Sequence, residues 1–189
     1  MAKSYLAGPS DHRTIKLVVI LVISVFLMLP TVPSIADPIP STGTVEVFFS
    51  PRGGATEAVT QKIAAAEDEI LIQAYGFTSK PIAKALLDAR KRGVKIEAVL
   101  DKSNATVKYS AATFLFHAGI PVLVDDKHPI AHNKIMIIDR ETLITGSFNF
   151  TAAEKNAENL LVIKRNKPLV EKYIRNFELH KGHSVQYSR

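Results

Sequence analysis

The chain of 189 residues contains neither cysteine nor tryptophan. Without cysteine, the protein can form neither disulfide bonds nor metal sites with thiolate ligands. Export to an oxidising compartment permits disulfides but does not require them. The absence of cysteine therefore indicates only that the core is stable without cross-links.

The chain also lacks an apolar run long enough to span a membrane. The longest run, Leu17 to Leu29, has 13 residues, whereas a span needs about 20. Basic residues precede this run and the small-x-small sequence Ser34-Ile35-Ala36 follows it. This layout predicts a secretory signal peptide over residues 1–36 and a periplasmic or secreted protein. An uncleaved membrane anchor is the alternative.

Neither sign of charge dominates, because 24 Lys and Arg residues face 18 Asp and Glu residues. The predicted leader holds three of the basic residues and one of the acidic ones. The mature chain would therefore have 153 residues and a net charge of +4. This length suits one domain with a substantial core. The small basic excess favours polyanionic partners without identifying one.

Apolar strand-like segments alternate with amphipathic segments of helical spacing. This alternation predicts an α/β fold in which helices flank both faces of a mixed β-sheet. Residues 37–43 are expected to form a linker and residues 44–189 the domain. The strands are predicted at 45–49, 70–75, 94–100, 121–124 and 160–163, beside one hairpin, and the helices at 56–67, 79–93, 107–117 and 168–180.

The run 131-AHNKIMIIDRETLITGSFNFT-151 carries the most chemistry. His132 can act as a nucleophile or a proton donor near neutral pH, and Lys134 can neutralise a phosphate. Two β-branched stretches flank the polar tip Asp139-Arg140-Glu141, which predicts a β-hairpin. If the turn centres on residues 140 and 141, Lys134 lies opposite Ser147, and His132 lies opposite Asn149. These four groups would form a patch that fits one phosphate.

Asp139 has the opposite strand parity to His132, so we expect it to point away from the patch. A structural role near the hairpin tip is predicted for it, through turn amides or a basic partner. Two roles remain open for Ser147. In the first it positions the phosphate or the downstream carboxylate Glu158. In the second it makes a side-chain hydrogen bond within the hairpin.

The motif His132-x-Lys134-x4-Asp139, followed by Gly146-Ser147-x-Asn149, resembles the signature of the phospholipase D superfamily. The chain length, the single motif copy and the leader resemble those of its small bacterial Nuc-type endonucleases. This resemblance implies a phospholipase D/nuclease-like sandwich over residues 44–189. It further implies that His132 forms a phosphohistidine, that Lys134 and Asn149 hold the phosphate, and that Glu158 orients the His132 ring.

One departure from the family pattern concerns the stretch before Glu158-Asn159. Thr151 to Ala157 is shorter than usual, and Glu154 is a competitor for the orienting role. Glu158 is preferred because Glu158-Asn159 matches the motif and opens an apolar strand.

A covalent histidine mechanism needs a second group to protonate the leaving oxygen and then activate water. The motif supplies one histidine per chain, so we expect a homodimer that shares its active site. The expected substrate is nucleic acid, single- or double-stranded, cleaved without a metal or other cofactor. No stable membrane association is expected after leader removal. The alternatives are a lipid phosphodiesterase of the phospholipase D or cardiolipin type and a non-catalytic nucleic-acid-binding module.

The other histidines receive no functional role from the sequence. His128 and His132 are four residues apart, as on a metal-binding helix, but Pro129 would break that helix. His117 is interpreted as a cation at a helix C-terminus. His180 and His183 lie in the tail and carry no recognised pattern.

Overall fold

A computed structural model of the protein describes residues 38–106, 111–152 and 156–188. The chain separates into two compact units, Met1–Pro38 and Ile39–Arg189, and every described helix and strand belongs to the second. The predicted leader and Glu154 lie outside the described residues. No helix of the described part is long and apolar enough to cross a membrane.

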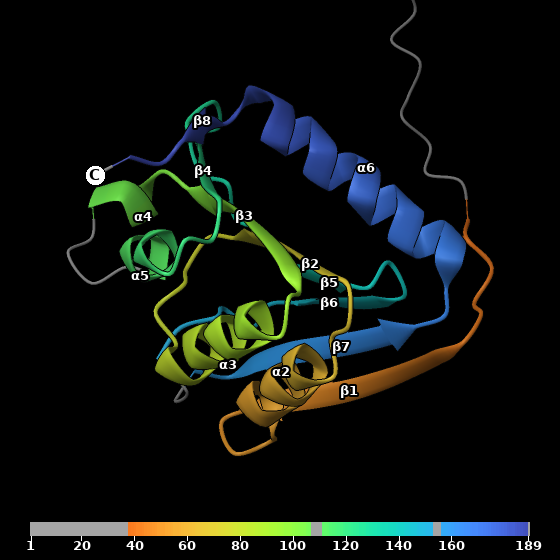
Figure 1. The fold of residues 1–189 in the computed structure, drawn as a ribbon. Helices are drawn as coiled ribbons and strands as arrows, with labels where there is room; N and C mark the ends of the chain where they lie inside the picture. The colour runs from red at the N-terminus through yellow and green to blue at the C-terminus, as the bar shows by residue number, and fades with distance from the viewer. Residues whose placement is uncertain (1–37, 107–110, 153–155, 189) are drawn as a thin grey trace, which may run out of the picture. The chain divides into compact units, whose positions relative to one another are not determined.

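One mixed sheet of eight strands forms the centre of the described domain, in the order β1-β7-β6-β5-β2-β3-β4-β8 (Figure 1). Strands β2, β3 and β4 run parallel, and every other neighbouring pair is antiparallel. The strands are β1 (Thr44–Ser50), β2 (Glu69–Ala74), β3 (Lys95–Asp101), β4 (Val122–Asp125), β5 (Lys134–Ile138), β6 (Thr142–Gly146), β7 (Glu158–Lys164) and β8 (Val185–Gln186).

Helices cover the two faces of this sheet, as the alternating sequence pattern predicts. The helices are α2 (Ala55–Ala64), α3 (Lys80–Lys91), α4 (Ser103–Thr106), α5 (Ala111–His117) and α6 (Lys167–His183). The larger apolar core joins α2, α3 and α5 to one face, with Ile63, Leu86 and Leu115 fully buried. On the other face, α6 packs against Val99 and Ile137 (Figure 1). The mixed α/β architecture is therefore confirmed.

Because side chains alternate along a strand, one strand can contribute residues to the apolar cores on both faces of the sheet. In β2, Ile70 and Ile72 belong to the larger core, whereas Leu71 between them belongs to the core under α6. Successive side chains of a strand point to opposite faces, so a continuous apolar run marks a strand that is covered on both sides. The run Ile70–Ile72 has this property and lies near the middle of the sheet.

The expected helix 107–117 is present as α5 from Ala111, and residues 107–110 lie outside the described part of the chain. Two short elements were not predicted from the sequence, α4 and β8. The two residues of β8 pair with Leu123 and Val124. Two residues are too few for an alternating pattern to be recognised.

The hairpin is present, but its predicted register is wrong by one residue. Ile138 pairs with Thr142 and Met136 with Ile144, so the turn has three residues centred on Arg140. Asp139 and Arg140 both adopt left-handed backbone angles, with φ of 50° and 54°. The turn is closed by the amide of Glu141, which donates to the carbonyl of Ile138 at 3.1 Å.

A β-bulge after Gly146 then resets the strand alternation. The amides of Ser147 and Phe148 both donate to the carbonyl oxygen of Asn159, each at 3.0 Å. Two residues of one strand therefore oppose one residue of the next, which bends the strand and redirects its side chains. Gly146 has a φ of 145°, and a Cβ there would lie 2.3 Å from the Asn159 oxygen. Glycine is required for this close approach.

Candidate active site

His132 and Lys134 lie where β5 begins, and their environments are opposite. The His132 side chain is exposed, whereas Lys134 is 6% exposed. Lys134 Nζ donates to the main-chain oxygen of His132 at 2.9 Å. The ammonium group therefore lies directly beneath the backbone that carries the imidazole, close enough to act on the same substrate group.

The charge of Lys134 is held in a partly desolvated position. Burial lowers the pKa of Lys134 below its ordinary value, and the negative charge of Glu158 offsets part of this effect. Lys134 Nζ also lies 5.2 Å from the centre of the Tyr75 ring, within the range of a cation–π contact. A weakly solvated ammonium group interacts more strongly with an incoming phosphate than one in bulk water.

Tyr75 follows β2 and packs against both motif residues. Its ring centre lies 4.5 Å from that of His132, with the planes tilted by 50°. The amide of Tyr75 donates to the carbonyl of Asn133 at 2.8 Å, which continues the β2–β5 pairing as far as the site. Tyr75 therefore limits the positions open to the imidazole of His132.

Asn149 and Glu158 form the second half of the site. Asn149 Nδ2 donates to Glu158 Oε1 at 2.8 Å, across the gap between the bulge and the start of β7. The main-chain amide of Glu158 donates to Ser50 Oγ at 3.2 Å. The hydrogen bond predicted from His132 to Glu158 stays a prediction, because the recorded partner of the Glu158 carboxylate is Asn149.

The amide of Asn149 is packed closely against the segment after β2. A Cβ on Gly76 would lie 3.4 Å from Asn149 Oδ1 and 2.8 Å from Thr151 Cγ2. Among the described residues, Asn149 Oδ1 is one of three buried side-chain atoms that make no hydrogen bond. Nδ2 keeps a second hydrogen that can donate to a phosphate oxygen.

Ser147 makes its side-chain hydrogen bonds to Asn159 on β7, outside the hairpin formed by β5 and β6. Ser147 Oγ donates to Asn159 Oδ1 at 2.7 Å and accepts from the Asn159 amide at 2.9 Å. Both bonds fasten the bulge to β7, one residue beyond Glu158. Ser147 therefore positions the strand that carries the carboxylate.

Asp139 makes the contacts expected of a structural residue. Its carboxylate accepts from the main-chain amides of Glu67, Asp68 and Glu69, at 3.0, 2.8 and 3.0 Å. These amides belong to the segment that enters β2. The hairpin tip is thereby attached to the neighbouring strand, as the opposite parity of Asp139 indicates.

Asp101 is a positioning residue that the sequence analysis missed. It is the last residue of β3, is 2% exposed, and accepts from the amide of Ala131 at 2.7 Å and from that of Ser103 at 2.9 Å. Burial alone would raise the pKa of Asp101, but these hydrogen bonds lower it, so the carboxylate is ionised at neutral pH. Ala131 precedes His132, so Asp101 fixes the backbone that presents the imidazole. The one sign of this role in the sequence is the position of Asp101, a carboxylate at the end of an apolar strand.

Two cavities adjoin the site at the end of β1. The smaller, of about 270 Å³, is lined by Phe49, Ser50, Ser147, Ala157, Glu158 and Asn159. The larger, of about 680 Å³, shares Phe49 and Ser50 and extends along residues 51–57 to Phe148 and Ala152. Both cavities are lined by Phe49 and Ser50, so they are neighbours on one hollow surface around the end of β1. The smaller cavity reaches Glu158, and Arg52 lines the larger.

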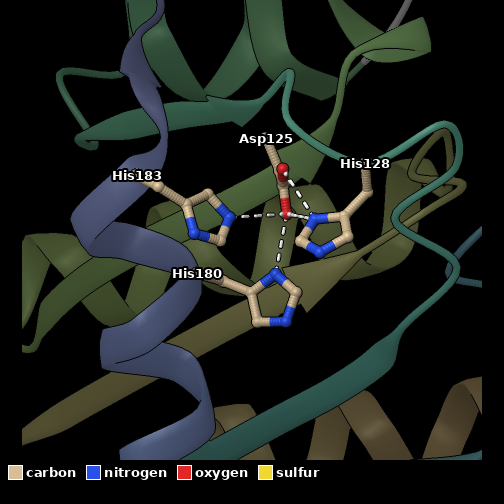
Figure 2. A group of neighbouring side chains, drawn as sticks. All are labelled: Asp125, His128, His180 and His183. Carbon is tan, nitrogen blue, oxygen red and sulfur yellow. Dashed lines mark hydrogen bonds and ion pairs between the residues drawn. The ribbon is translucent and has the colours of Figure 1, made fainter. Parts of the chain in front are cut away.

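The remaining histidines correct the sequence interpretation. His128 and His132 do not share a helix, as predicted. However, His128 belongs to a group of neighbouring side chains. His128, His180 and His183 converge on the buried carboxylate of Asp125 (Figure 2). This group contains the residues that could hold a metal in the described part of the chain.

The arrangement at β5 and β7 suits attack on a phosphodiester. It combines an exposed imidazole, a buried ammonium group, an amide donor and a carboxylate, on strands that a bulge and Asp101 hold in place. Such a set can bind a phosphate, stabilise added negative charge and supply a nucleophile.

The comparisons with known proteins agree with this geometry. A family model described as "Cardiolipin synthase, PLD-like domain" matches residues 59–181. A "Phospholipase D" of Rickettsia felis is 44% identical over 135 residues, which cover 70% of this chain and 67% of that protein. A "Mitochondrial cardiolipin hydrolase" of Mus musculus is 30% identical over 118 residues, 61% of this chain and 53% of that protein.

A solved structure provides the corresponding evidence for the fold. The crystal structure of Nuc from Salmonella typhimurium, a phospholipase D family member, is 37% identical and superposes with a TM-score of 0.74. The match covers 77% of this chain and 99% of that one. The chain therefore belongs to the phospholipase D superfamily, as a phosphodiesterase with the fold of its Nuc member.

Proposed function

We propose that the protein is a non-specific endonuclease that hydrolyses DNA, with RNA as an alternative substrate of the same chemistry, through a phosphohistidine at His132. The observation that carries this proposal is the exposed His132, whose main-chain oxygen accepts a hydrogen bond from the buried ammonium of Lys134. The similarity to Nuc over nearly its whole length supports it. The hollow surface beside Glu158 offers room for a polynucleotide.

The reaction proceeds in two balanced steps. A ring nitrogen of His132 attacks phosphorus, and the bond from phosphorus to the leaving sugar oxygen breaks as that oxygen takes a proton from a second acid. Water then gives its proton to the same group and attacks phosphorus, and the phosphorus–nitrogen bond breaks. Lys134 and Asn149 stabilise the extra negative charge in both steps.

The second acid is proposed to be His132 of the partner subunit. Each chain carries one copy of the motif, so a shared site in a homodimer supplies the pair of imidazoles. An exposed apolar row on the edge strand β1 supports this assembly, with Val45, Val47 and Phe49 exposed by 54%, 51% and 60%. Phe49 also lines both cavities, so a chain packed on this row would border the site.

A mixing experiment tests the shared site. Equal amounts of wild-type chain and His132→Ala chain are allowed to exchange subunits, and DNA cleavage is measured. If both imidazoles are needed, only wild-type homodimers are active, and about a quarter of the activity per dimer remains. If each chain works alone, about half remains, and the shared site would be rejected.

A lipid phosphodiesterase is the second candidate function. The similarity to proteins named phospholipase D and cardiolipin hydrolase supports this candidate. Ile130, two residues before His132, is 59% exposed and could contact acyl chains near the site. This candidate requires hydrolysis of vesicle phospholipid that depends on Ile130.

One assay separates the two candidates. The mature chain is incubated with plasmid DNA and, separately, with cardiolipin-containing vesicles, each in millimolar EDTA. We expect plasmid cleavage and intact lipid. Lipid hydrolysis without plasmid cleavage would establish the second candidate. Complete loss of plasmid cleavage in EDTA, restored by magnesium or zinc, would contradict a metal-independent reaction.

The location of the protein is also proposed to be periplasmic or secreted, with residues 1–36 removed. The basic flank, the short apolar run and Ser34-Ile35-Ala36 support cleavage before Asp37. Intact-mass measurement of the exported protein should give a chain that begins within two residues of Asp37. A full-length chain in the membrane fraction would instead support an uncleaved anchor.

A further inference from the structure

A group of one carboxylate and three imidazoles lies outside the catalytic residues. Asp125 is the last residue of β4, and His128 follows three residues later in the loop that leads to His132. His180 and His183, also three residues apart, occupy the last turn of α6. Figure 2 shows the three rings directed at the Asp125 carboxylate from the loop and the helix.

The contacts in this group converge on one atom. Asp125 is fully buried, and its Oδ2 lies 2.7 Å from His180 Nδ1, 2.9 Å from His128 Nδ1 and 3.3 Å from His183 Nε2. The ring centres are 4.9 to 5.2 Å apart. One ligand atom from each of the four residues lies within 4.8 Å of all the others.

Hydrogen bonding does not use all of these nitrogens. In the part of the chain that the structure describes, His183 Nε2 is buried and makes no hydrogen bond, although it faces Asp125. Buried polar atoms are normally satisfied, so this nitrogen needs a partner. A cation between the four residues would satisfy it together with the other two imidazoles.

The donor set selects the class of cation. Three imidazole nitrogens and one carboxylate oxygen suit zinc and its neighbours, whereas magnesium and calcium prefer oxygen ligands throughout. Tetrahedral zinc, with bonds of about 2.0–2.2 Å, needs ligand atoms about 3.3–3.6 Å apart. The separations from Asp125 Oδ2 fall at or below this range, and the four ligand atoms all lie within 4.8 Å of one another. Side-chain shifts of about 1 Å would therefore bring the four atoms to tetrahedral spacing.

The surroundings of the group also fit a metal ligand set. The amide of Lys127 donates to Asp125 Oδ1 at 3.2 Å, which orients the carboxylate and leaves Oδ2 for the centre. The His128 side chain is 44% exposed and gives an ion a path inward.

We propose that Asp125, His128, His180 and His183 bind one divalent transition-metal ion of the zinc class. Four protein ligands close the coordination sphere, which is typical of a structural rather than a catalytic site. The ion would fasten the end of α6 and the loop 126–133 to β4. That loop contains His132, and Asp101 already accepts a hydrogen bond from the amide of the preceding residue, Ala131. The metal therefore stabilises the catalytic loop without taking part in the reaction.

The test uses the mature chain stripped of metal with a chelator, which is then removed. Titration calorimetry with zinc chloride should show one saturable site per chain. At a hundredfold excess of zinc over its dissociation constant, Tm should rise by about 5–10 °C. Substituting cobalt should give the visible absorption bands of a tetrahedral ion.

Matched variants locate the site. His128→Ala and His180→Ala should each weaken zinc binding at least tenfold and abolish the rise in Tm. His117→Ala removes an exposed histidine elsewhere and should leave zinc binding unchanged. His132→Ala should also leave it unchanged. Absence of saturable binding of zinc, cobalt or nickel would overturn the proposal, as would undiminished binding in both cluster variants.

The role of the ion is tested separately from nuclease activity. Stripped protein, assayed well below its Tm in EDTA, should still cleave DNA, while its Tm lies below that of the zinc-loaded protein. If the protein binds zinc at the cluster but does not cleave DNA, the metal site is supported and the proposed nuclease function is rejected. A zinc requirement for cleavage at all temperatures would reject the structural role.

Discussion

The predicted catalytic group and the Asp125 group both contain histidine and a carboxylate, but they differ in how these side chains are buried. At the catalytic site the histidine is exposed and the lysine beneath it is buried, so the reactive imidazole faces solvent. At the second site the carboxylate is fully buried and the three imidazoles surround it. The exposed His132 fits its proposed role as a reactant, whereas the three half-buried imidazoles that face Asp125 fit their proposed role as ligands.

The largest expected effect separates the groups through His132. His132→Ala should reduce DNA cleavage by at least about 10⁴-fold, because removal of a nucleophile abolishes the covalent route. Tm and zinc binding should not change, because the side chain is exposed. Steady-state cleavage rates and thermal melting check this prediction. An active His132→Ala protein would show that the nucleophile is another group.

His132→Asn provides a second variant with a polar side chain of similar reach. An amide is not a nucleophile, so no phosphoprotein should accumulate in acid-quenched reactions, whereas wild-type protein should show one. Comparable phosphoprotein in both proteins would contradict the assignment of His132.

Lys134→Met is expected to have the next largest effect on the cleavage rate, which should fall. The stability of the protein should stay the same or increase. Loss of one preorganised charge should reduce the rate by about 10²–10³-fold. Because burial lowers the folded-state pKa of Lys134, the charged form opposes folding at neutral pH, and this cost declines as the pH rises through that pKa. Replacement by methionine should therefore leave the unfolding free energy at pH 7 unchanged or larger.

Urea unfolding at pH 7 provides the measurement for Lys134→Met. Lys134→Ala serves as a control, since it removes the charge but also leaves a cavity. A large loss of stability in Lys134→Met, equal to that of Lys134→Ala, would indicate that Lys134 holds the fold and not the substrate.

The two groups also differ in how far the sequence predicted them. The four residues predicted to be catalytic fall within residues 132–158, so one stretch of the sequence was enough to propose them. The alternation of apolar segments predicted the sheet and its helices. The predicted register was wrong by one residue, because the turn has three residues, Asp139 to Glu141, and begins with left-handed angles at Asp139 and Arg140. The bulge after Gly146 then brought Asn149 to Glu158 by a route that simple alternation could not predict.

The Asp125 group escaped the sequence analysis because its halves lie far apart in the chain. Asp125 and His128 are separated from His180 and His183 by about fifty residues. Only the packing of α6 across the sheet joins them. The two spacings of three residues were visible, but each pair alone is too common to indicate a metal.

A substitution in the apolar row on β1 is expected to have an intermediate effect on activity. Val47→Lys should weaken the proposed dimer, and activity at low protein concentration should fall about tenfold or more, because a charge would be buried at the interface. Leu179→Lys is the matched control, since Leu179 is 67% exposed on α6, away from β1. Analytical ultracentrifugation should show more monomer for Val47→Lys alone. A fully dimeric Val47→Lys protein would place the interface elsewhere.

The smallest expected effect concerns the pH dependence of the catalytic group. Lys134 must be protonated to hold a phosphate, and burial lowers its pKa from the ordinary value of 10.5. The rate kcat/KM should therefore begin to fall on the alkaline side at a pH below that value. Lys134→Arg keeps a permanent charge, so its reduced activity should persist further into the alkaline range. Tyr75→Phe, which removes the neighbouring hydroxyl, should keep the alkaline fall of the wild type. If Lys134→Arg and the wild type lose activity at the same pH, the alkaline limit belongs to another group, and the buried ammonium of Lys134 would not control the rate.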